Sequence, residues 1–186
     1  RHICVFSIKK LMKSKENLIF LGMMGSGKSS IGMLVAKKLK LNFIDIDNEI
    51  EKELGTTISK VFEDKGEDYF RKIEVKITLS ELKKFNSVIA LGGGAFINNS
   101  IRKEIINSCV SFWLDLDLKH LTQRLKNTKK RPLLNKDNFE KSINKIYLER
   151  KKTYNESNYR IKCNSEEKRN IVEKIIKIYE NSSNKI

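Results

Sequence analysis

The sequence is poor in the residues that crosslinked or metal-stabilised domains depend on. Its 186 residues include three cysteines and two histidines. Cys4, Cys109 and Cys163 are widely separated and form no CxxC pair, which argues against a disulfide framework or a zinc site and favours a reducing compartment. We therefore expect a cytoplasmic protein.

Proline and long apolar runs are also scarce. Pro132 is the single proline, and no Gly/Ser-rich spacer or internal repeat is present, so we expect one domain over residues 1–186. Residues 1–11 mix apolar and basic side chains and are too short and interrupted to span a membrane, and no other stretch approaches the necessary length. Met12 is a candidate start, which would make residues 1–11 an extension.

Acidic residues are outnumbered by basic ones, 23 to 38, which gives a formal net charge of +15. Such a charge is typical of nucleic-acid-binding proteins and leaves that function open as an alternative. The lysines, however, are spread over nearly every segment, and no basic patch is interleaved with aromatic residues. We therefore expect no nucleic-acid partner.

A phosphate-binding loop is the strongest motif present. Residues 22–29 read GMMGSGKS and follow the apolar run 18–21, which predicts a strand, a glycine-rich turn and then a helix over 31–39. Backbone N–H groups in such a turn face an anionic phosphate, Lys28 reaches the β- and γ-phosphates, and the Ser29 hydroxyl binds Mg²⁺. The predicted nucleotide contacts in the loop are Gly25, Ser26, Gly27, Lys28, Ser29 and Ser30.

Strand and helix patterns alternate along the rest of the chain. Strands are predicted at 18–21, 41–45, 87–91, 109–116 and 159–163. Helices are predicted at 31–39, 48–54, 119–125, 139–154 and 166–179. Between 54 and 87, a short helix capped by Thr56 or Thr57 is predicted to run through Phe62, and Gly66 separates it from a longer amphipathic helix that ends at Leu82. This order predicts a three-layer α/β/α P-loop kinase fold around a five-stranded parallel sheet, with a helical insertion over 45–82 and a mobile lid over 124–138.

Five motifs narrow the chemistry beyond nucleotide binding. They are FIDID at 43–47, FRKIE at 70–74, GGG at 92–94, RPLL at 131–134, and Arg150 with Tyr154. In this order and spacing, from Leu18 to Cys163, the chain resembles the shikimate kinases. The resemblance implies a monomeric enzyme that uses ATP and Mg²⁺ to phosphorylate the 3-hydroxyl of shikimate, giving shikimate 3-phosphate in aromatic amino acid biosynthesis.

The resemblance also implies roles for the two carboxylates of FIDID. Asp47 matches the residue that hydrogen-bonds the ring hydroxyls of shikimate and is a candidate acceptor of the reacting proton. Asp45 matches a residue that, with Ser29, holds Mg²⁺. Asp47 also stands directly before the predicted helix at 48–54, where an aspartate is favoured as an N-cap, so capping is an alternative role.

Arginines and glycines complete the implied site. Arg71 and Arg150 match the pair that clamps the substrate carboxylate, a task that suits the planar guanidinium better than an ammonium group. Gly92, Gly93 and Gly94 follow a strand, where a backbone without side chains can approach the ring. Arg131 in the lid matches the arginine that reaches the transferring phosphates, and is counted with Lys28 and Asp47 as catalytic. Arg124 matches an arginine beside the adenine.

Other residues are expected to be structural. Glu74 is predicted to orient Arg71, Trp113 to lie in the core, and Asp117 to cap a helix. Nucleotide contacts near Asn164 are left open because the region from 158 to 165 departs from the family pattern. A gluconate kinase or a nucleoside-monophosphate kinase of the same fold remains the nearest alternative enzyme.

Overall fold

The computed structural model describes residues 16–126, 138–164 and 166–182. The expected extension, residues 1–11, lies outside the described residues. So does most of the expected lid, including Arg131, while Arg124 at its start is described. No helix within the described ranges combines the length and the apolar character that a membrane crossing requires.

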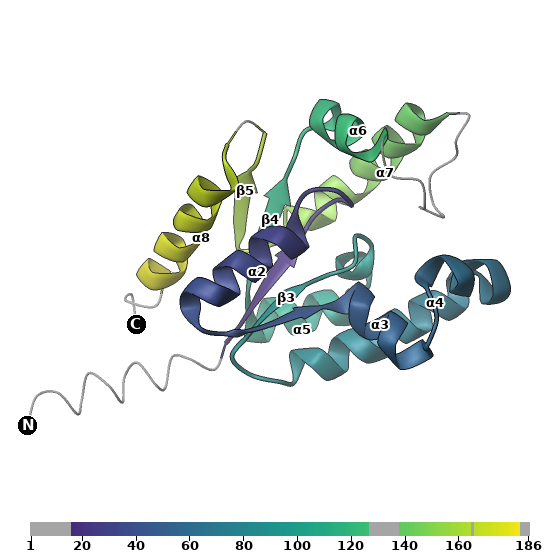
Figure 1. The fold of residues 1–186 in the computed structure, drawn as a ribbon, viewed down its shortest axis with the longest axis horizontal. Coiled ribbons are helices and arrows are strands. Elements are labelled where there is room, and N and C mark those ends of the chain that lie inside the picture. The colour runs from purple at the N-terminus through teal and green to yellow at the C-terminus, as the bar shows by residue number, and fades with distance from the viewer. Residues whose placement is uncertain (1–15, 127–137, 165, 183–186) are drawn as a thin grey trace, which may run out of the picture.

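A five-stranded parallel sheet forms the centre of the molecule (Figure 1). The strands are β1 (Asn17–Leu21), β2 (Asn42–Asp45), β3 (Ser87–Ala90), β4 (Cys109–Asp115) and β5 (Tyr159–Lys162). Their order across the sheet is β2-β3-β1-β4-β5, and every neighbouring pair is parallel. The predicted fold class is thereby confirmed, and the carboxyl ends of all five strands meet at one edge.

Helices cover both faces of this sheet, as Figure 1 shows. They are α2 (Lys28–Leu39), α3 (Ile46–Leu54), α4 (Ile58–Leu82), the 3-10 helix η1 (Ala95–Ile97), α5 (Asn99–Ser108), α6 (Leu118–Lys126), α7 (Phe139–Tyr154) and α8 (Lys168–Ser182). Helix α2 packs against β1, β2, β3 and α8, whereas α5 packs against β4 and α4. These contacts produce the three predicted layers.

Two local differences from the sequence prediction matter for the site. Helix α3 begins at Ile46 rather than at residue 48, and its N-cap is Asp45, whose Oδ1 accepts the Asp47 N–H at 3.1 Å. The capping role considered for Asp47 is therefore wrong, because Asp47 lies inside the first turn. Helix α5 was not predicted, although Asn98 caps it by accepting the N–H groups of Ser100 and Ile101.

Helix α4 is interrupted at Gly66, which has φ 80° and ψ 174°. A side chain rarely adopts this backbone conformation, so glycine is required here. The segment before the break is capped by Thr57, whose Oγ1 accepts the Lys60 N–H at 3.3 Å. The break redirects the chain and starts a new helical segment at Glu67, as the sequence predicted.

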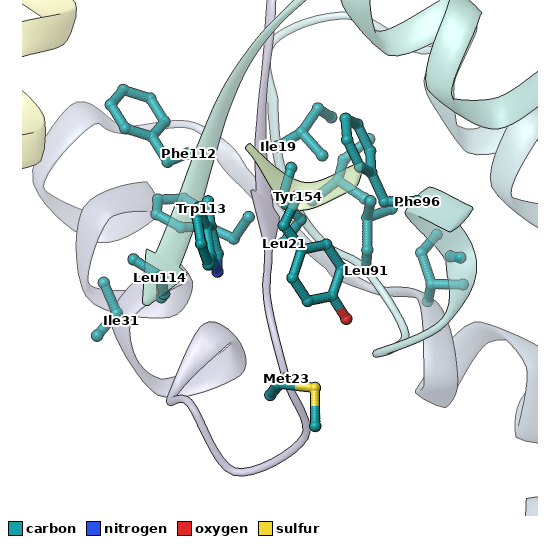
Figure 2. Close-up of a cluster of buried hydrophobic side chains, with 14 of the residues drawn as sticks. Ile19, Leu21, Met23, Ile31, Leu91, Phe96, Phe112, Trp113, Leu114 and Tyr154 are labelled. Atoms are coloured by element: carbon teal, nitrogen blue, oxygen red, sulfur yellow. The ribbon is translucent and has the colours of Figure 1, made fainter. Parts of the chain in front are cut away.

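The core lies around the central strands (Figure 2). All five residues of β1 are buried because helices cover both faces of the sheet. Trp113 on β4 is 1% exposed, which confirms its predicted core position, and its ring lies 5.9 Å from that of Tyr154 on α7. The Tyr154 ring thus anchors α7 in the core beside Leu21 and Leu91.

Gly32 allows α2 to lie close to the edge of the sheet. A Cβ built at Gly32 would come within 2.9 Å of Cε2 of Phe43 and 3.5 Å of Cγ1 of Val88. Any larger residue would push α2 away from β2, the edge strand. Helix α2 carries Ser29 and β2 ends at Asp45, so this contact sets the spacing of two predicted site residues.

Candidate active site

A cleft of about 1010 Å³ opens at the carboxyl edge of the sheet. Most of the residues singled out from the sequence line it: Gly25, Gly27, Lys28, Ser29, Ser30, Asp45, Asp47, Arg71, Gly92, Gly93, Gly94, Arg124 and Arg150. They come from β1–α2, β2–α3, α4, the segment after β3, α6 and α7. Folding therefore gathers residues as far apart in the sequence as Gly25 and Arg150.

The loop between β1 and α2 has the conformation expected of a phosphate-binding turn. Gly25 and Gly27 have φ values of 77° and 97°, in the region that glycine adopts without strain. Lys28 folds back over the loop and donates from Nζ to the carbonyls of Gly22 at 3.1 Å and Met23 at 3.0 Å. The ammonium group is thus held at the mouth of the turn.

Two loop serines differ from one another in their surroundings. Ser30 lines the cleft and donates to the Gly27 carbonyl at 3.1 Å. Ser26 is 1% exposed and does not line the cleft. Its Oγ is buried and has no hydrogen-bond partner among the described residues, so only its backbone remains available for the predicted phosphate contact.

Ser29 and Asp45 are brought into direct contact. The Ser29 Oγ donates to Asp45 Oδ2 at 2.5 Å, while Oδ1 of the same carboxylate accepts the Asp47 N–H. Both groups are hard oxygen donors, which suits Mg²⁺. Within the described residues, no cluster of three or more His, Cys, Asp or Glu side chains is placed to hold a metal ion.

Asp47 faces the first glycine of the triplet together with Glu74. A Cβ at Gly92 would lie 2.6 Å from Glu74 Oε1 and 2.8 Å from Asp47 Oδ1. Both carboxylates therefore converge on this point of the backbone, and the absence of a side chain gives them room.

Glu74 is 2% exposed, and its Oε1 has no hydrogen-bond partner among the described residues. Burial raises the pKa of Glu74, and the nearby Asp47 carboxylate adds to this, while Arg71 and Arg150 act in the opposite direction. This oxygen is itself buried, so Glu74 keeps an unpartnered acceptor beneath the surface of the cleft.

Arg71 on α4 is held by two carboxylates. It donates from Nη1 to Glu74 Oε2 at 2.6 Å, which agrees with the predicted orienting role of Glu74. It also donates from Nε and Nη2 to Glu67 Oε1, at 3.1 and 3.0 Å. Although burial disfavours the charge on Arg71, Glu74 and Glu67 outweigh it and raise the pKa of the guanidinium. Arg71 therefore stays charged.

The third glycine leaves space for that guanidinium. A Cβ at Gly94 would lie 2.7 Å from Nη1 of Arg71 and 3.0 Å from its Cζ and Nη2. Gly94 has φ −103°, which other residues also adopt. Glycine is thus needed here for space and not for backbone conformation.

Helix α7 supplies the second arginine of the predicted clamp. Arg150 donates from Nη1 to the Gly93 carbonyl at 2.8 Å, and the Tyr154 hydroxyl donates to the same oxygen. Tyr154 is one turn beyond Arg150 and so lies on the same face of the helix. The glycine triplet and α7 are therefore linked directly.

A second contact fixes α7 at Tyr147, also on this face. Its hydroxyl donates to Asp115 Oδ1 at 3.2 Å, and Arg160 donates to Oδ2 of the same buried carboxylate at 2.7 and 2.9 Å. The Arg160 guanidinium also lies 4.6 Å from the centre of the Trp113 ring. Asp115 at the end of β4 thus serves structure.

Arg124 and Lys168 line the cleft on the phosphate-loop side. Arg124 donates from Nη1 to the Gly25 carbonyl at 3.2 Å. Asn164 uses Oδ1 to accept the Asp117 N–H at 2.9 Å, so that oxygen is engaged by the protein itself. Asp117 in turn accepts the His120 N–H at 2.9 Å, which confirms its predicted capping role.

Sequence reasoning missed several residues of this site. Glu67, which holds Arg71, was not singled out, although its spacing of four residues before Arg71 is a helical pairing signal. Lys168 was not identified either. Further cleft residues from α3 and the first half of α4 were also missed: Asn48, Glu51, Ile58, Ser59 and Phe62. They belong to the expected helical insertion, but no motif marked them individually.

Comparisons with known proteins agree with this geometry. The family model described as shikimate kinase matches residues 24–180. The shikimate kinase of Bartonella henselae is 37% identical over 180 residues, which cover 95% of this chain and 86% of that protein. The shikimate kinase of Persephonella marina is 38% identical over 87% of this chain and 97% of its own length.

Solved structures give the same result. The shikimate kinase from Acinetobacter baumannii in complex with shikimate matches with a TM-score of 0.88 and 31% identity, covering 96% of this chain and 99% of that one. A gluconokinase from Sinorhizobium meliloti matches with a TM-score of 0.57 at 15% identity, which reflects the shared fold alone. The family model and the relatives, which are covered over most of their length, all indicate shikimate kinase. The chain therefore belongs to the shikimate kinase family.

Proposed function

We propose that this protein transfers the γ-phosphoryl group of ATP to the 3-hydroxyl of shikimate, with the residues gathered in the cleft acting as the resemblance implied. One observation carries this proposal. The phosphate-binding loop and the Asp47, Arg71 and Arg150 side chains line a single cleft, so a nucleotide and a carboxylated acceptor can be held face to face.

On the nucleotide side, the loop N–H groups and Lys28 bind and neutralise the phosphates. Arg124 is assigned to a contact with the adenine of ATP. Arg131, which lies outside the described residues, is assigned to the transferring phosphate.

Ser29 and Asp45 are assigned to Mg²⁺. Their direct contact and oxygen chemistry support the assignment. When bound, the ion would offset the charge that develops on the β- and γ-phosphate oxygens during transfer.

On the acceptor side, Arg71 and Arg150 bind the substrate carboxylate, while the glycine triplet allows the ring to approach the backbone. Asp47 hydrogen-bonds the ring hydroxyls and accepts the proton of the 3-hydroxyl as its oxygen forms the new bond to phosphorus. Two arginines thus orient the substrate, and one carboxylate accepts the proton. The protein acts as a monomer.

The test is ADP release from Mg-ATP in the presence of shikimate, gluconate, nucleoside monophosphates or no acceptor. We expect release to depend on shikimate, with shikimate 3-phosphate as the product. Release with gluconate or a nucleoside monophosphate alone would keep the nucleotide assignments and contradict those of Asp47, Arg71 and Arg150. No acceptor-dependent release together with salt-sensitive RNA binding would favour the nucleic-acid alternative.

A further inference from the structure

Arg71 has a different acidic partner on each side along α4. Glu74 follows it by three residues and accepts one hydrogen bond from Nη1, and Glu67 precedes it by four residues and accepts from Nε and Nη2. An arginine carries five N–H groups. Among the described residues, these bonds use three, leaving one N–H on each terminal nitrogen for a ligand.

The two carboxylates differ in position. The Glu74 side chain is 2% exposed and lines the cleft, whereas the Glu67 side chain is 49% exposed and is not among the residues that line it. Glu67 is the first residue after the break at Gly66, where the second segment of α4 begins. It therefore holds Arg71 from outside the cleft without occupying the space of the substrate.

This arrangement addresses a specific cost of binding an anion. A free arginine side chain loses rotational freedom when a ligand orders it, and that loss weakens binding. The single bond from Nη1 to Glu74 fixes one nitrogen of the guanidinium, whose Cζ also lies 5.1 Å from the centre of the Phe70 ring. The two bonds from Nε and Nη2 to Glu67 define the plane of the guanidinium.

We propose that Glu67 is a positioning residue, which fixes the guanidinium plane of Arg71 before the substrate carboxylate arrives. The proposal rests on the assignment of Arg71 to that carboxylate. Glu67 itself touches neither substrate nor nucleotide.

The experiment is calorimetric titration of shikimate into the full chain and its variants. Glu67→Ala removes both bonds, and we expect shikimate to bind about fivefold more weakly. Glu67→Gln keeps an oxygen that can accept the same bonds while removing the charge, so its affinity should stay within about twofold of the original. Asp68→Ala, which removes the same charge at the exposed neighbouring residue, is the matched control and should bind as the original does.

A neutral probe separates positioning from a general effect on folding. The methyl ester of shikimate lacks the carboxylate, so its affinity should be the same for the original chain and for Glu67→Ala. An equal loss for the ester and for shikimate would overturn the proposal. It would also be overturned if Glu67→Ala and Glu67→Gln both bound shikimate more tightly, because Glu67 would then act as a competing charge.

The result is distinguishable from failure of the proposed function. If the original chain does not bind shikimate at all, the assignment of the substrate fails first. If it binds shikimate and the Glu67→Ala variant binds it equally well, only the positioning role of Glu67 is wrong.

Discussion

The two glycine-rich segments of the cleft use glycine for different reasons. In the phosphate-binding loop, Gly25 and Gly27 have positive φ values, and the backbone conformation itself requires them. In the triplet after β3, Gly94 has an ordinary φ, but a Cβ there would meet the Arg71 guanidinium. The nucleotide side thus depends on the shape of the backbone, and the acceptor side depends on space for charged side chains.

The largest effect should come from the nucleotide side. Lys28→Met removes the positive charge at the mouth of the loop, and we expect kcat to fall by about a thousandfold because charge on the transferring phosphate is no longer offset. Steady-state ADP release measures this. Lys37→Met, an exposed lysine of the same helix, is the control. An unchanged shikimate affinity in Lys28→Met would show that the nucleotide side and the acceptor side act separately. A large loss of shikimate affinity would show that they do not.

The corresponding change on the acceptor side is Arg71→Lys. Charge is kept but the fork geometry is lost, so we expect KM for shikimate to rise about tenfold to a hundredfold while KM for ATP stays nearly constant. Initial rates at varied shikimate and fixed ATP give both constants. Arg102→Lys, an arginine paired with Glu156, is the control. A shikimate KM that stays normal in Arg71→Lys would contradict the clamp assignment.

A matched pair of alanine substitutions tests the two uses of glycine directly. Gly27→Ala forces a side chain into a left-handed conformation and should lower the free energy of unfolding by about 1–2 kcal/mol while raising KM for ATP. Gly94→Ala should cost little stability but raise KM for shikimate about tenfold, because the methyl group displaces Arg71. Urea unfolding and initial rates give these values. Equal losses of stability in Gly27→Ala and Gly94→Ala would contradict the view that glycine serves backbone conformation at one position and space at the other.

The smallest effect concerns the buried carboxyl beside Arg71. Because folding raises the pKa of Glu74 above its ordinary value of 4.5, the folded protein binds this proton more tightly than the unfolded chain. Its contribution to stability is therefore full below pH 4.5 and is lost as the pH rises through the folded pKa. The free energy of unfolding of the original chain, relative to that of Glu74→Gln, should therefore fall as the pH rises from 4.5 through the raised pKa of Glu74.

Urea unfolding of both proteins at a series of pH values measures this difference. A relative stability that rises with pH would mean that the charge pair with Arg71 outweighs burial. Glu81→Gln, another largely buried carboxyl on the same helix, is the control.

Regular patterns made most of the fold predictable. The helix at Phe139–Tyr154 was predicted with the bounds that it has, because apolar residues recur at helical spacing and turn residues flank it. Helix α5 was overlooked despite the capping signal of Asn98 and the apolar pair Ile101 and Ile105, since a short helix between two strands gives few repeats of the pattern.

The site was less predictable than the fold, because partners come from separate elements. The sequence placed Asp45 and Asp47 together but gave no means of knowing where α3 begins, and this alone decides which carboxylate is the cap. The contact of Arg150 and Tyr154 with the Gly93 carbonyl joins α7 to the segment after β3. No local pattern in either segment indicates it.

The close approach of α2 to β2 at Gly32 has a consequence for variation within this protein. Gly32 follows Ser29 by three residues on α2, and Phe43, which it contacts, precedes Asp45 by two residues on β2. Positions 32 and 43 therefore jointly control the distance between Ser29 and Asp45, the residues assigned to Mg²⁺. A larger residue at 32 is tolerable only with a smaller one at 43. These two positions should therefore change together, and a single substitution at either should weaken metal binding without altering a ligand.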